Sequence, residues 1–232
     1  MDGVYNIYKE AGWTSFDVVA KMRGILHIKK IGHTGTLDPN ATGVLPVCVG
    51  RYTKLVEKIA GDDKEYVAVM LLGVRTDSQD TTGTVLEPVA NAVDPATLTK
   101  DEVLSAIESF VGGYDQLPPM YSAKKVGGKK LVDLARKGIE VERTPRFVSI
   151  SAIAVEDMDL PRVRMRVTCG KGTYIRTLCN DIGDKLGCGA CMESLVRTRV
   201  GSYTIEDSVT LEELQRISDE NCLEKIATQP AF

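Results

Sequence analysis

The sequence predicts an α+β protein with a mixed, mainly antiparallel sheet flanked by helices. Short apolar or alternating segments, typical of strands, are intermixed with amphipathic segments that begin at helix-capping residues. These segments do not follow the regular strand–helix–strand rhythm of a parallel α/β fold. The strand segments at 4–9 and 162–170 alternate in polarity, whereas those at 44–50 and 64–73 are largely apolar, as buried strands are.

The N-terminal elements are a strand, a helix and a second strand. Residues 4–9, VYNIYK, alternate as a short strand does. Residues 14–26, TSFDVVAKMRGIL, predict a helix capped by Thr14 or Ser15. Its expected apolar face consists of Phe16, Val19, Met22 and Leu26. A loop rich in glycine and threonine follows, and residues 44–50, VLPVCVG, then predict a buried strand.

The later elements follow the same reasoning. Further strands are predicted at 64–73, 146–158, 162–170 and 190–201, and further helices at 52–61, 99–113, 131–138, 173–187 and 210–219. Thr99 caps the clearest of these helices and the Gly112–Gly113 pair ends it. A chain of 232 residues can form one large domain, and we expect a single domain over residues 1–232. It should have a projecting insertion at about 116–143 and a short acidic tail at about 204–232.

Composition narrows the class of protein. The chain is 43% hydrophobic and 26% charged, as in ordinary soluble domains. No apolar run approaches the roughly 20 residues that a membrane span needs, and the N-terminus lacks the pattern of a secretory signal. We therefore expect a cytoplasmic protein without a membrane partner. The pair Cys188 and Cys191 leaves a zinc site open, but buried thiols are the favoured interpretation of the six cysteines.

Charge is distributed unevenly along the chain. The net charge is −3, yet residues 21–30 carry basic residues and no acid, and residues 120–146 are also predominantly basic. Most of the compensating acid lies elsewhere, notably in the C-terminal tail. A basic face on a slightly acidic protein suits RNA binding, although a basic run by itself is more often a solvated surface.

The loop GHTGTLDPNATG, residues 32–43, surrounds one acid with turn-forming and small polar residues. Asp38 is therefore the leading candidate for a nucleophile or a base. Pro39 fixes the φ angle after it, and threonine hydroxyls can hold the loop through hydrogen bonds to the backbone. The alternative is that Asp38 is simply a turn residue. His33 in the same loop is more suited to shaping it or contacting substrate than to moving a proton.

Three further candidate site residues lie on or next to predicted helices or strands. Lys171 lies between two glycines at the start of a predicted helix, where it could attract phosphate, and Arg176 follows in the first turn. Arg176 could serve as a fixed cation beside Asp38, keeping that carboxylate ionised. Tyr66, in an apolar strand, could present its ring to a base. The alternatives are a surface arginine and a core tyrosine.

The Asp38 loop with the strand after it, GHTGTLDPNATGVLPVCVG, closely resembles the catalytic signature of the TruB-type tRNA pseudouridine synthases. Other segments agree with this family in order and spacing, from about residue 4 to residue 203. They are KEAGWTS, KEYVAVMLLGVRTDSQDTTG, LPPMYSAKKVGGKKLVDLARKG, CGKGTYIRTL and GCGACMESLVRTRVG. Glu10 stands where the family usually has proline. The chain ends about thirty residues after the last of these motifs, so we expect no C-terminal RNA-binding PUA domain.

The resemblance implies the pseudouridine synthase fold and the isomerisation of uridine to pseudouridine at position 55 in the T loop of tRNA, with no metal or organic cofactor. It assigns the catalytic aspartate to Asp38, the base-stacking tyrosine to Tyr66 and the aspartate-pairing arginine to Arg176. Residues with substrate-binding or supporting roles by the same resemblance are His33, Asp80, Leu195 and Lys9. Lys171 is added as a substrate-binding candidate because of its place at the start of a predicted helix. Segment 116–143 matches an RNA-clasping insertion.

The expected partner is the T stem-loop of tRNA, and we expect a monomer without an obligate protein partner. Two other functions stay open at this point. One is a protein that binds or folds the tRNA elbow without chemistry, and the other is a pseudouridine synthase acting on another RNA. The chemical route also stays open, since Asp38 could attack the ribose C1′ or remove a proton from C2′ so that a glycal forms.

Overall fold

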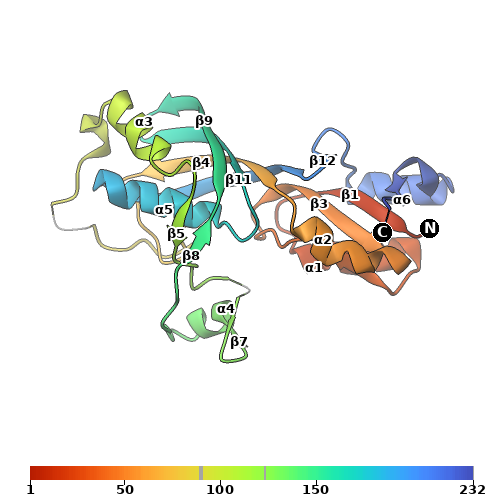
Figure 1. Cartoon of the computed structure of the whole chain (residues 1–232). Helices are drawn as coiled ribbons and strands as arrows, with labels where there is room; N and C mark the ends of the chain where they lie inside the picture. The colour runs from red at the N-terminus through yellow and green to blue at the C-terminus, as the bar shows by residue number, and fades with distance from the viewer. Residues whose placement is uncertain (89–90, 123, 232) are drawn as a thin grey trace. The chain divides into compact units, whose positions relative to one another are not determined.

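The computed structural model describes residues 1–88, 91–122 and 124–231 and divides into two units (Figure 1). The first unit consists of residues 1–67 and 195–232, and the second of residues 68–194. Two long strands, β4 (Lys64–Leu72) and β11 (Ala190–Val200), begin in one unit and end in the other. Each unit is described separately below.

The first unit is built on antiparallel strands and one parallel pair. Its other strands are β1 (Gly3–Lys9), β2 (Ile31–His33), β3 (Thr42–Val49), β12 (Tyr203–Thr204) and β13 (Ala227–Thr228). Its helices are α1 (Ser15–Leu26), α2 (Val56–Ala60) and α6 (Leu211–Asp219), with 3₁₀ turns η1 (Gly50–Leu55) and η3 (Leu223–Lys225). The hydrogen-bonded order is β13-β1-β3-β11, with β2 also on β3 and β12 on β11. Only the β3–β11 pair among these is parallel.

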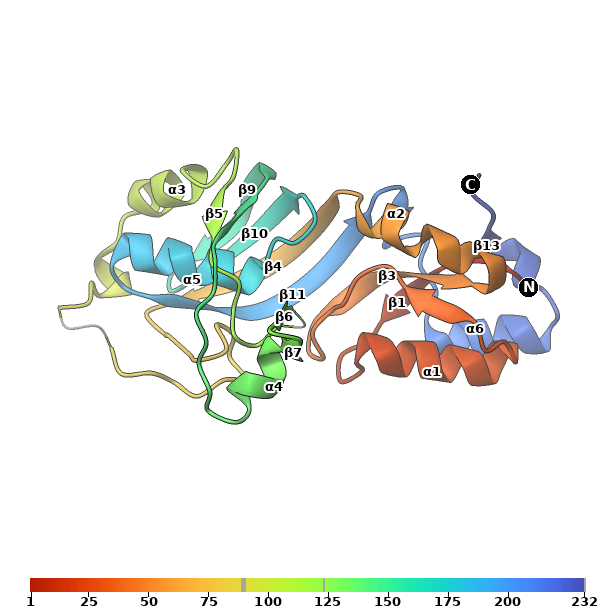
Figure 2. The ribbon, with the colours of Figure 1, turned by 60° about the horizontal axis from the view of Figure 1, so that its bottom comes forward.

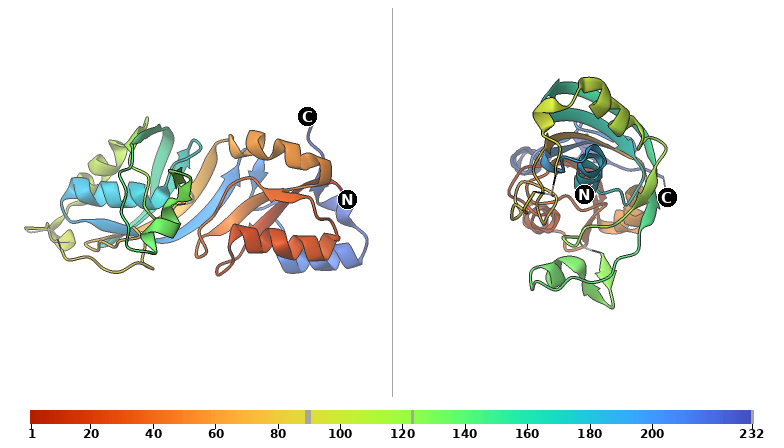
Figure 3. Two further views of the ribbon diagram at one scale, coloured as in Figure 1. Left: turned by 90° about the horizontal axis from the view of Figure 1, so that it is seen from below. Right: turned by 90° about the vertical axis from the view of Figure 1, so that its left-hand side faces the viewer.

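Helices cover both faces of this sheet because its strands alternate between two apolar cores. On β1 and β3, Tyr5 and Leu45 pack with α1 and α6, whereas Val4 and Val44 pack with η1 and α2. Figures 2 and 3 show α1 on one side of β1 and β3 and α2 on the other. Strands with two covered faces become nearly continuous apolar runs, as the sequence of β3 does.

The second unit contains the strand order β4-β10-β9, with β11 beside β4. Its remaining elements are η2 (Pro95–Thr97), α3 (Lys100–Glu108), β5 (Tyr114–Gln116), β6 (Lys125–Val126), β7 (Lys129–Lys130), α4 (Leu131–Ala135), β8 (Arg146–Val148), β9 (Ile150–Asp159), β10 (Arg162–Cys169) and α5 (Ile175–Leu186). Along β10 apolar residues are buried and the arginines between them are more exposed. Helix α3 contacts both α5 and β9.

The segment of the expected insertion connects two paired strands. Strands β5 and β8 are antiparallel, with Tyr114 opposite Val148 and Gln116 opposite Arg146. The chain between them includes α4 and β7, which lie below β5 and β8 in Figure 1. Residue 123 of this segment is outside the described residues. The segment therefore leaves and rejoins the unit at neighbouring points.

The predicted fold class is confirmed, and so are most of the elements. One wrong prediction is the burial of Phe16, whose side chain is 64% exposed. The buried stripe of α1 includes Val18 and Ile25 as well as Met22, and at about 100° per residue this stripe turns away from Phe16. The Arg23 guanidinium lies 5.8 Å from the centre of the Phe16 ring.

Two boundaries also differ from the predictions, and one strand was not predicted. The helix expected at 52–61 begins as the 3₁₀ turn η1, where the Thr53 hydroxyl donates to the carbonyl of Gly50. Helix α3 ends at Glu108 rather than at the glycine pair, since the Gly112 N–H bonds instead to the Ile150 carbonyl. Strand β2 was not expected. Within the described part of the chain, no helix is long and apolar enough to span a bilayer.

Candidate active site

Asp38 begins a tight turn between β2 and β3 in the first unit. The Ala41 N–H donates to the Asp38 carbonyl over 3.0 Å, which closes a β-turn of residues 38–41. Pro39 occupies the second position of this turn, where its fixed φ angle is favoured, and an aspartate is common at the first position. The Asp38 side chain is half-buried. The local sequence thus explains why the carboxylate is held on a short, rigid turn.

Neighbouring elements fix this loop from behind. The Leu37 N–H donates to the Ser15 hydroxyl over 2.9 Å, which joins the loop to the first residue of α1. The Thr34 hydroxyl donates to the Pro46 carbonyl over 3.1 Å, as expected for a threonine that stabilises the loop. Both side chains are at most 2% exposed, so these bonds are shielded from competing water.

Lys9, at the end of β1, ties the turn to the start of α1. Its Nζ donates to three carbonyl oxygens, those of Glu10 at 3.0 Å, Trp13 at 2.6 Å and Pro39 at 3.0 Å. The Lys9 side chain is fully buried. Burial lowers its pKa to about 8, with Arg197 acting in the same direction and Asp38 opposing it. Three carbonyl acceptors offset part of the cost of burying a cation here.

A second buried cation, Arg197 of β11, contacts the same loop from another side. Its Nε donates to the Val44 carbonyl at 2.7 Å and its Nη2 to the Gly35 carbonyl at 3.2 Å. Arg197 pairs in parallel register with Gly43, whose φ is +104°. A Cβ atom at position 43 would lie 2.2 Å from the Arg197 carbonyl oxygen. Only glycine permits this approach.

His33 of β2 lies at the entry to the loop. Burial lowers the pKa of its imidazole, and Arg197 contributes in the same direction. Its Nδ1 is buried and has no hydrogen-bond partner among the residues that the structure describes. A neutral imidazole of this kind can still donate or accept a hydrogen bond.

Tyr66 and Leu195 supply apolar surface in the first unit. Tyr66 lies on β4 and is 7% exposed, and Leu195 lies on β11 and is 9% exposed. The ring and the branched side chain are of the type that sandwiches a planar base.

Arg176 and Asp80 form an ion pair in the second unit. Arg176 Nη1 lies 3.6 Å from Asp80 Oδ2, and both side chains are largely buried. Arg176 Nη2 also donates to the Tyr121 carbonyl over 2.7 Å. The guanidinium, in the first turn of α5, therefore connects that helix with two loops of the same unit.

The Asp80 carboxylate is fixed by its own loop. Its Oδ1 accepts from the Ser78 hydroxyl at 2.8 Å and from the Thr82 N–H at 2.9 Å. The backbone of the loop is joined to β11 by the bond from the Thr81 N–H to the Met192 carbonyl, 3.0 Å long. These contacts leave Oδ2 directed to Arg176.

Lys171 is exposed in the turn before α5. The residue after it, Gly172, has a φ of +84°. The N–H of Tyr174, the N-cap residue of α5, is already bonded to Gln116 Oε1 at 2.8 Å. Lys171 thus offers a solvent-accessible cation near the start of a helix.

The cysteines have the environment of structural thiols. None of the six forms a disulfide in the part of the chain that the structure describes, and all except the half-buried Cys222 are buried. Burial raises the pKa of Cys48 and that of Cys191 to about 11. Thiols with raised pKa values are poor nucleophiles at neutral pH. Over residues 1–88, 91–122 and 124–231, no cluster of three or more His, Cys, Asp or Glu side chains has the arrangement of a metal site.

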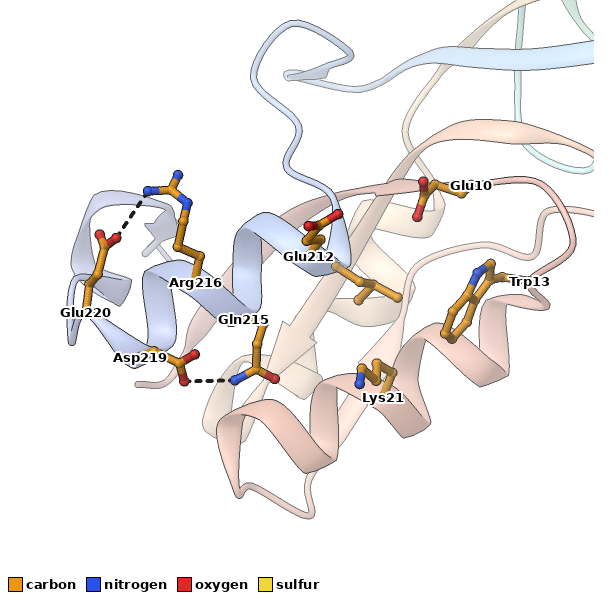
Figure 4. Close-up of a pocket in the computed structure, with 9 residues that line it drawn as sticks. Glu10, Trp13, Lys21, Glu212, Gln215, Arg216, Asp219 and Glu220 are labelled. Atoms are coloured by element: carbon orange, nitrogen blue, oxygen red, sulfur yellow. Dashed lines mark hydrogen bonds and ion pairs between the residues drawn. The ribbon is translucent and has the colours of Figure 1, made fainter.

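The first unit also contains a groove of about 690 Å³ between the start of α1 and α6 (Figure 4). Its lining residues are Glu10, Trp13, Lys21, Leu211, Glu212, Gln215, Arg216, Asp219 and Glu220. Carboxylates outnumber cations in this set, and Arg216 is already paired with Glu220 at 3.2 Å. Such a surface repels a phosphate backbone.

Sequence reasoning did not identify the role of Arg197 or the pairing of Arg176 with Asp80. One signal for Arg197 existed, because a charged residue two positions after Leu195 on a strand shares its face. No spacing in the sequence indicates the Arg176–Asp80 pair, since the two residues are far apart along the chain.

Comparison with known proteins covers almost the whole chain. Residues 23–175 match the family described as "TruB family pseudouridylate synthase (N terminal domain)", and residues 176–228 match "tRNA pseudouridylate synthase B C-terminal domain". A relative from Clostridium tetani, named tRNA pseudouridine synthase B, is 51% identical over 97% of this chain and 76% of its own length. A relative of the same name from Lachnoclostridium phytofermentans is 52% identical over 97% of this chain and 75% of its own.

Among solved structures, one described as "Crystal Structure of a Cbf5-Nop10-Gar1 Complex" contains a similar chain with a TM-score of 0.74 and 32% identity. The likeness covers 97% of this chain and 57% of that one, so this chain spans a little over half the length of that protein.

Proposed function

Because the chain belongs to the TruB family of pseudouridylate synthases, we propose that it isomerises uridine to pseudouridine in tRNA, at position 55 of the T loop. The expected pseudouridine synthase fold is confirmed by the structural likeness. The observation that carries the proposal is the Asp38 turn, which is held by buried contacts from β1, α1 and β11. A rigid carboxylate is what chemistry at a sugar carbon requires.

The reaction separates into base extrusion and bond exchange. A stacked uridine must leave the loop of its RNA, at a cost of a few kcal/mol. The bond between C1′ and N1 then breaks, the uracil turns, and C5 bonds to C1′. Asp38 acts at the ribose, either by attacking C1′ or by removing a proton from C2′. Tyr66 and Leu195 hold the freed uracil between apolar surfaces, so that it stays bound while it turns.

The other roles in the reaction belong to polar and charged side chains. Arg176 keeps the Asp38 carboxylate ionised, and Asp80 contacts the extruded uracil. His33 helps to displace the target base, and Lys171 binds phosphate. Lys9 stabilises the catalytic turn, a role supported by its bond to Pro39. The uracil never leaves, so the reaction needs no redox cofactor or second substrate.

The substrate surface follows from the distribution of charge. Segment 116–143 and the basic residues 21–30 contact the phosphates of the T stem-loop and offset the cost of extrusion. The same domain, residues 1–232, acts as a monomer in the cytoplasm, where its tRNA substrate is found.

Replacement of Asp38 by asparagine tests the function directly. We expect the Asp38→Asn variant to bind a tRNA transcript with the affinity of the wild-type protein while forming no pseudouridine. A wild-type protein that binds the tRNA but forms no product would instead show a non-catalytic elbow-binding protein. Mapping of modified positions in a deletion strain completes the test, because loss of pseudouridine outside the T loop would identify another RNA as the substrate.

A further inference from the structure

Arg197 is a buried cation without a carboxylate partner. Its side chain belongs to a residue that is 1% exposed, and both of its hydrogen bonds go to backbone carbonyls. In the described ranges no ion pair involves it. Burying a charge is costly unless hydrogen bonds compensate for it. An apolar residue would fill a strand position at lower cost, so stability alone does not account for this arginine.

The two carbonyls that Arg197 binds stand on either side of Asp38. Gly35 lies before the catalytic turn and Val44 lies after it, in the buried part of β3. One guanidinium therefore joins the two ends of the loop across its base. A planar guanidinium with several fixed N–H donors can reach two separate carbonyls at once. An ammonium has all its N–H donors on one nitrogen atom and is less suited to this geometry.

The backbone of β11 supports the same arrangement. Arg197 lies opposite Gly43 in the parallel pairing of β11 and β3, and a side chain at position 43 would collide with its carbonyl. Because of this close approach, the backbone of Arg197 lies directly against Gly43, at the end of the loop. Leu195, the proposed base-binding residue, is two positions earlier on the same strand.

The charge of Arg197 also reaches the surroundings of Asp38. Charged or titratable groups near the loop are Lys9 on β1, Asp17 on α1, His33 on β2, Lys64 on β4 and Arg197 itself. Arg197 acts on both Lys9 and His33 in this set. Removing one positive charge from this group makes the environment less favourable to a carboxylate.

We propose that Arg197 is a positioning residue for the reaction: by binding the carbonyls of Gly35 and Val44 it holds the Asp38 turn in its active geometry. The inference rests on the proposed function, since it concerns the same site. Arg197 itself touches neither the base nor the sugar. Its contribution is expected in the chemical step and not in the binding of tRNA.

The test compares Arg197→Lys and Arg197→Met with matched changes at Arg199. Arg199 is on the same strand and also binds a carbonyl, that of Gly201, at 3.1 Å, but this carbonyl is not in the catalytic loop. Pseudouridine formation is measured on a tRNA transcript, together with the dissociation constant for that transcript and the pH dependence of kcat/KM.

We expect Arg197→Lys to lower kcat about tenfold and Arg197→Met about a hundredfold, because a displacement of the order of 1 Å has effects of this size. Both variants should bind tRNA within about twofold of the wild-type affinity. The acidic limb of the pH profile should move upward in Arg197→Met and stay in place in Arg197→Lys. Both Arg199 variants should keep kcat within about twofold.

The inference is overturned if Arg197→Lys turns over at the wild-type rate per tRNA-binding molecule, which can be measured even if Arg197→Met does not fold. It is also overturned if the Arg199 variants lose as much kcat as the Arg197 variants. A wild-type protein without pseudouridine formation would refute the proposed function, whereas normal formation by wild type and by both Arg197 variants would refute this inference alone.

Discussion

The Nζ atom of Lys9 lies 3.0 Å from the carbonyl oxygen of Pro39, the residue that directly follows Asp38. An ammonium can donate to all three of its carbonyl acceptors, but a neutral amine has only two N–H groups. The pKa of Lys9 is lowered to about 8, chiefly by burial. We therefore expect kcat/KM to fall as the pH rises through about 8.

The variant Lys9→Arg identifies the titrating group. Its guanidinium stays charged across this range, so the alkaline limb should move to higher pH even though kcat is lower at every pH. An alkaline limb that stays near pH 8 in Lys9→Arg would assign the titration to another group.

The same shift predicts how stability depends on pH. Between about 8 and 10.5 the folded state holds Lys9 neutral while the unfolded chain still binds the proton. Stability rises with pH wherever the unfolded state binds more protons. We expect the difference in unfolding free energy between wild type and Lys9→Met to shift in favour of wild type from pH 7.5 to pH 10 in urea titrations. A constant difference would contradict the lowered pKa.

Substitution at Gly43 should destabilise the protein more than substitution at a positive-φ glycine that has open space around its Cβ position. Gly43→Ala adds a collision with the Arg197 carbonyl to an unfavourable positive φ. Gly12 also has a positive φ, +84°, but has open space around its Cβ position. Gly12→Ala should cost about 1–2 kcal/mol of stability, and Gly43→Ala more than that. Equal unfolding midpoints for the two variants would argue against the close approach of β11 to Gly43.

Caps of equal chemistry should differ in their effect on activity. Thr14 and Thr210 each form a capping box, at the start of α1 and of α6, and loss of either hydroxyl should cost about 1 kcal/mol. Thr14 precedes Ser15, which binds the catalytic loop. We therefore expect Thr14→Ala to lower kcat as well as the unfolding free energy, and Thr210→Ala to lower only the latter. Identical kcat values in the two variants would show that the cap of α1 does not affect the catalytic loop.

Local signals were sufficient to predict the Asp38 turn. Proline after aspartate, flanked by glycines and threonines, specifies a tight turn through backbone preferences that act within a few residues. The capping boxes of α1, α3 and α6 are encoded in the same short range. These features depend on neighbours in the sequence, so they could be inferred without coordinates.

Long-range contacts to carbonyls could not be predicted in the same way. Every residue has a carbonyl, so nothing in the sequence marks those of Gly35 and Val44 as the acceptors of Arg197. The exposure of Phe16 was missed for a different reason. The predicted face of α1 omits Val18 and Ile25, and with these two residues included the helical period places Phe16 outside the buried stripe.

Breaking the Arg176–Asp80 ion pair should lower both the unfolding free energy and kcat, whereas breaking a more exposed ion pair should change neither by much. Asp80→Asn removes a carboxylate partner of a largely buried guanidinium, which should destabilise the protein by about 1–3 kcal/mol. It should also lower kcat, by misplacing Arg176 and by removing the carboxylate proposed to contact the uracil. Glu193→Gln removes a partner from the more exposed Arg162 and should cost below about 1 kcal/mol. Urea unfolding and single-turnover assays compare the two. A similar small cost for both would show that the buried pair is not important.

Opposite charges on two surfaces should respond in opposite ways to charge reversal. Lys137, exposed just after α4, lies in the segment proposed to contact tRNA, whereas Glu212 lines the acidic groove of the first unit. Lys137→Glu should weaken tRNA binding several-fold and reduce the slope of log Kd against log salt by about one, as expected when one phosphate contact is lost. Glu212→Lys should leave both quantities unchanged or strengthen binding slightly, because the acidic lining of that groove disfavours contact with phosphates. Binding titrations at four salt concentrations separate the two effects, and a much tighter complex with a steeper salt dependence for Glu212→Lys would place the RNA over α6 instead.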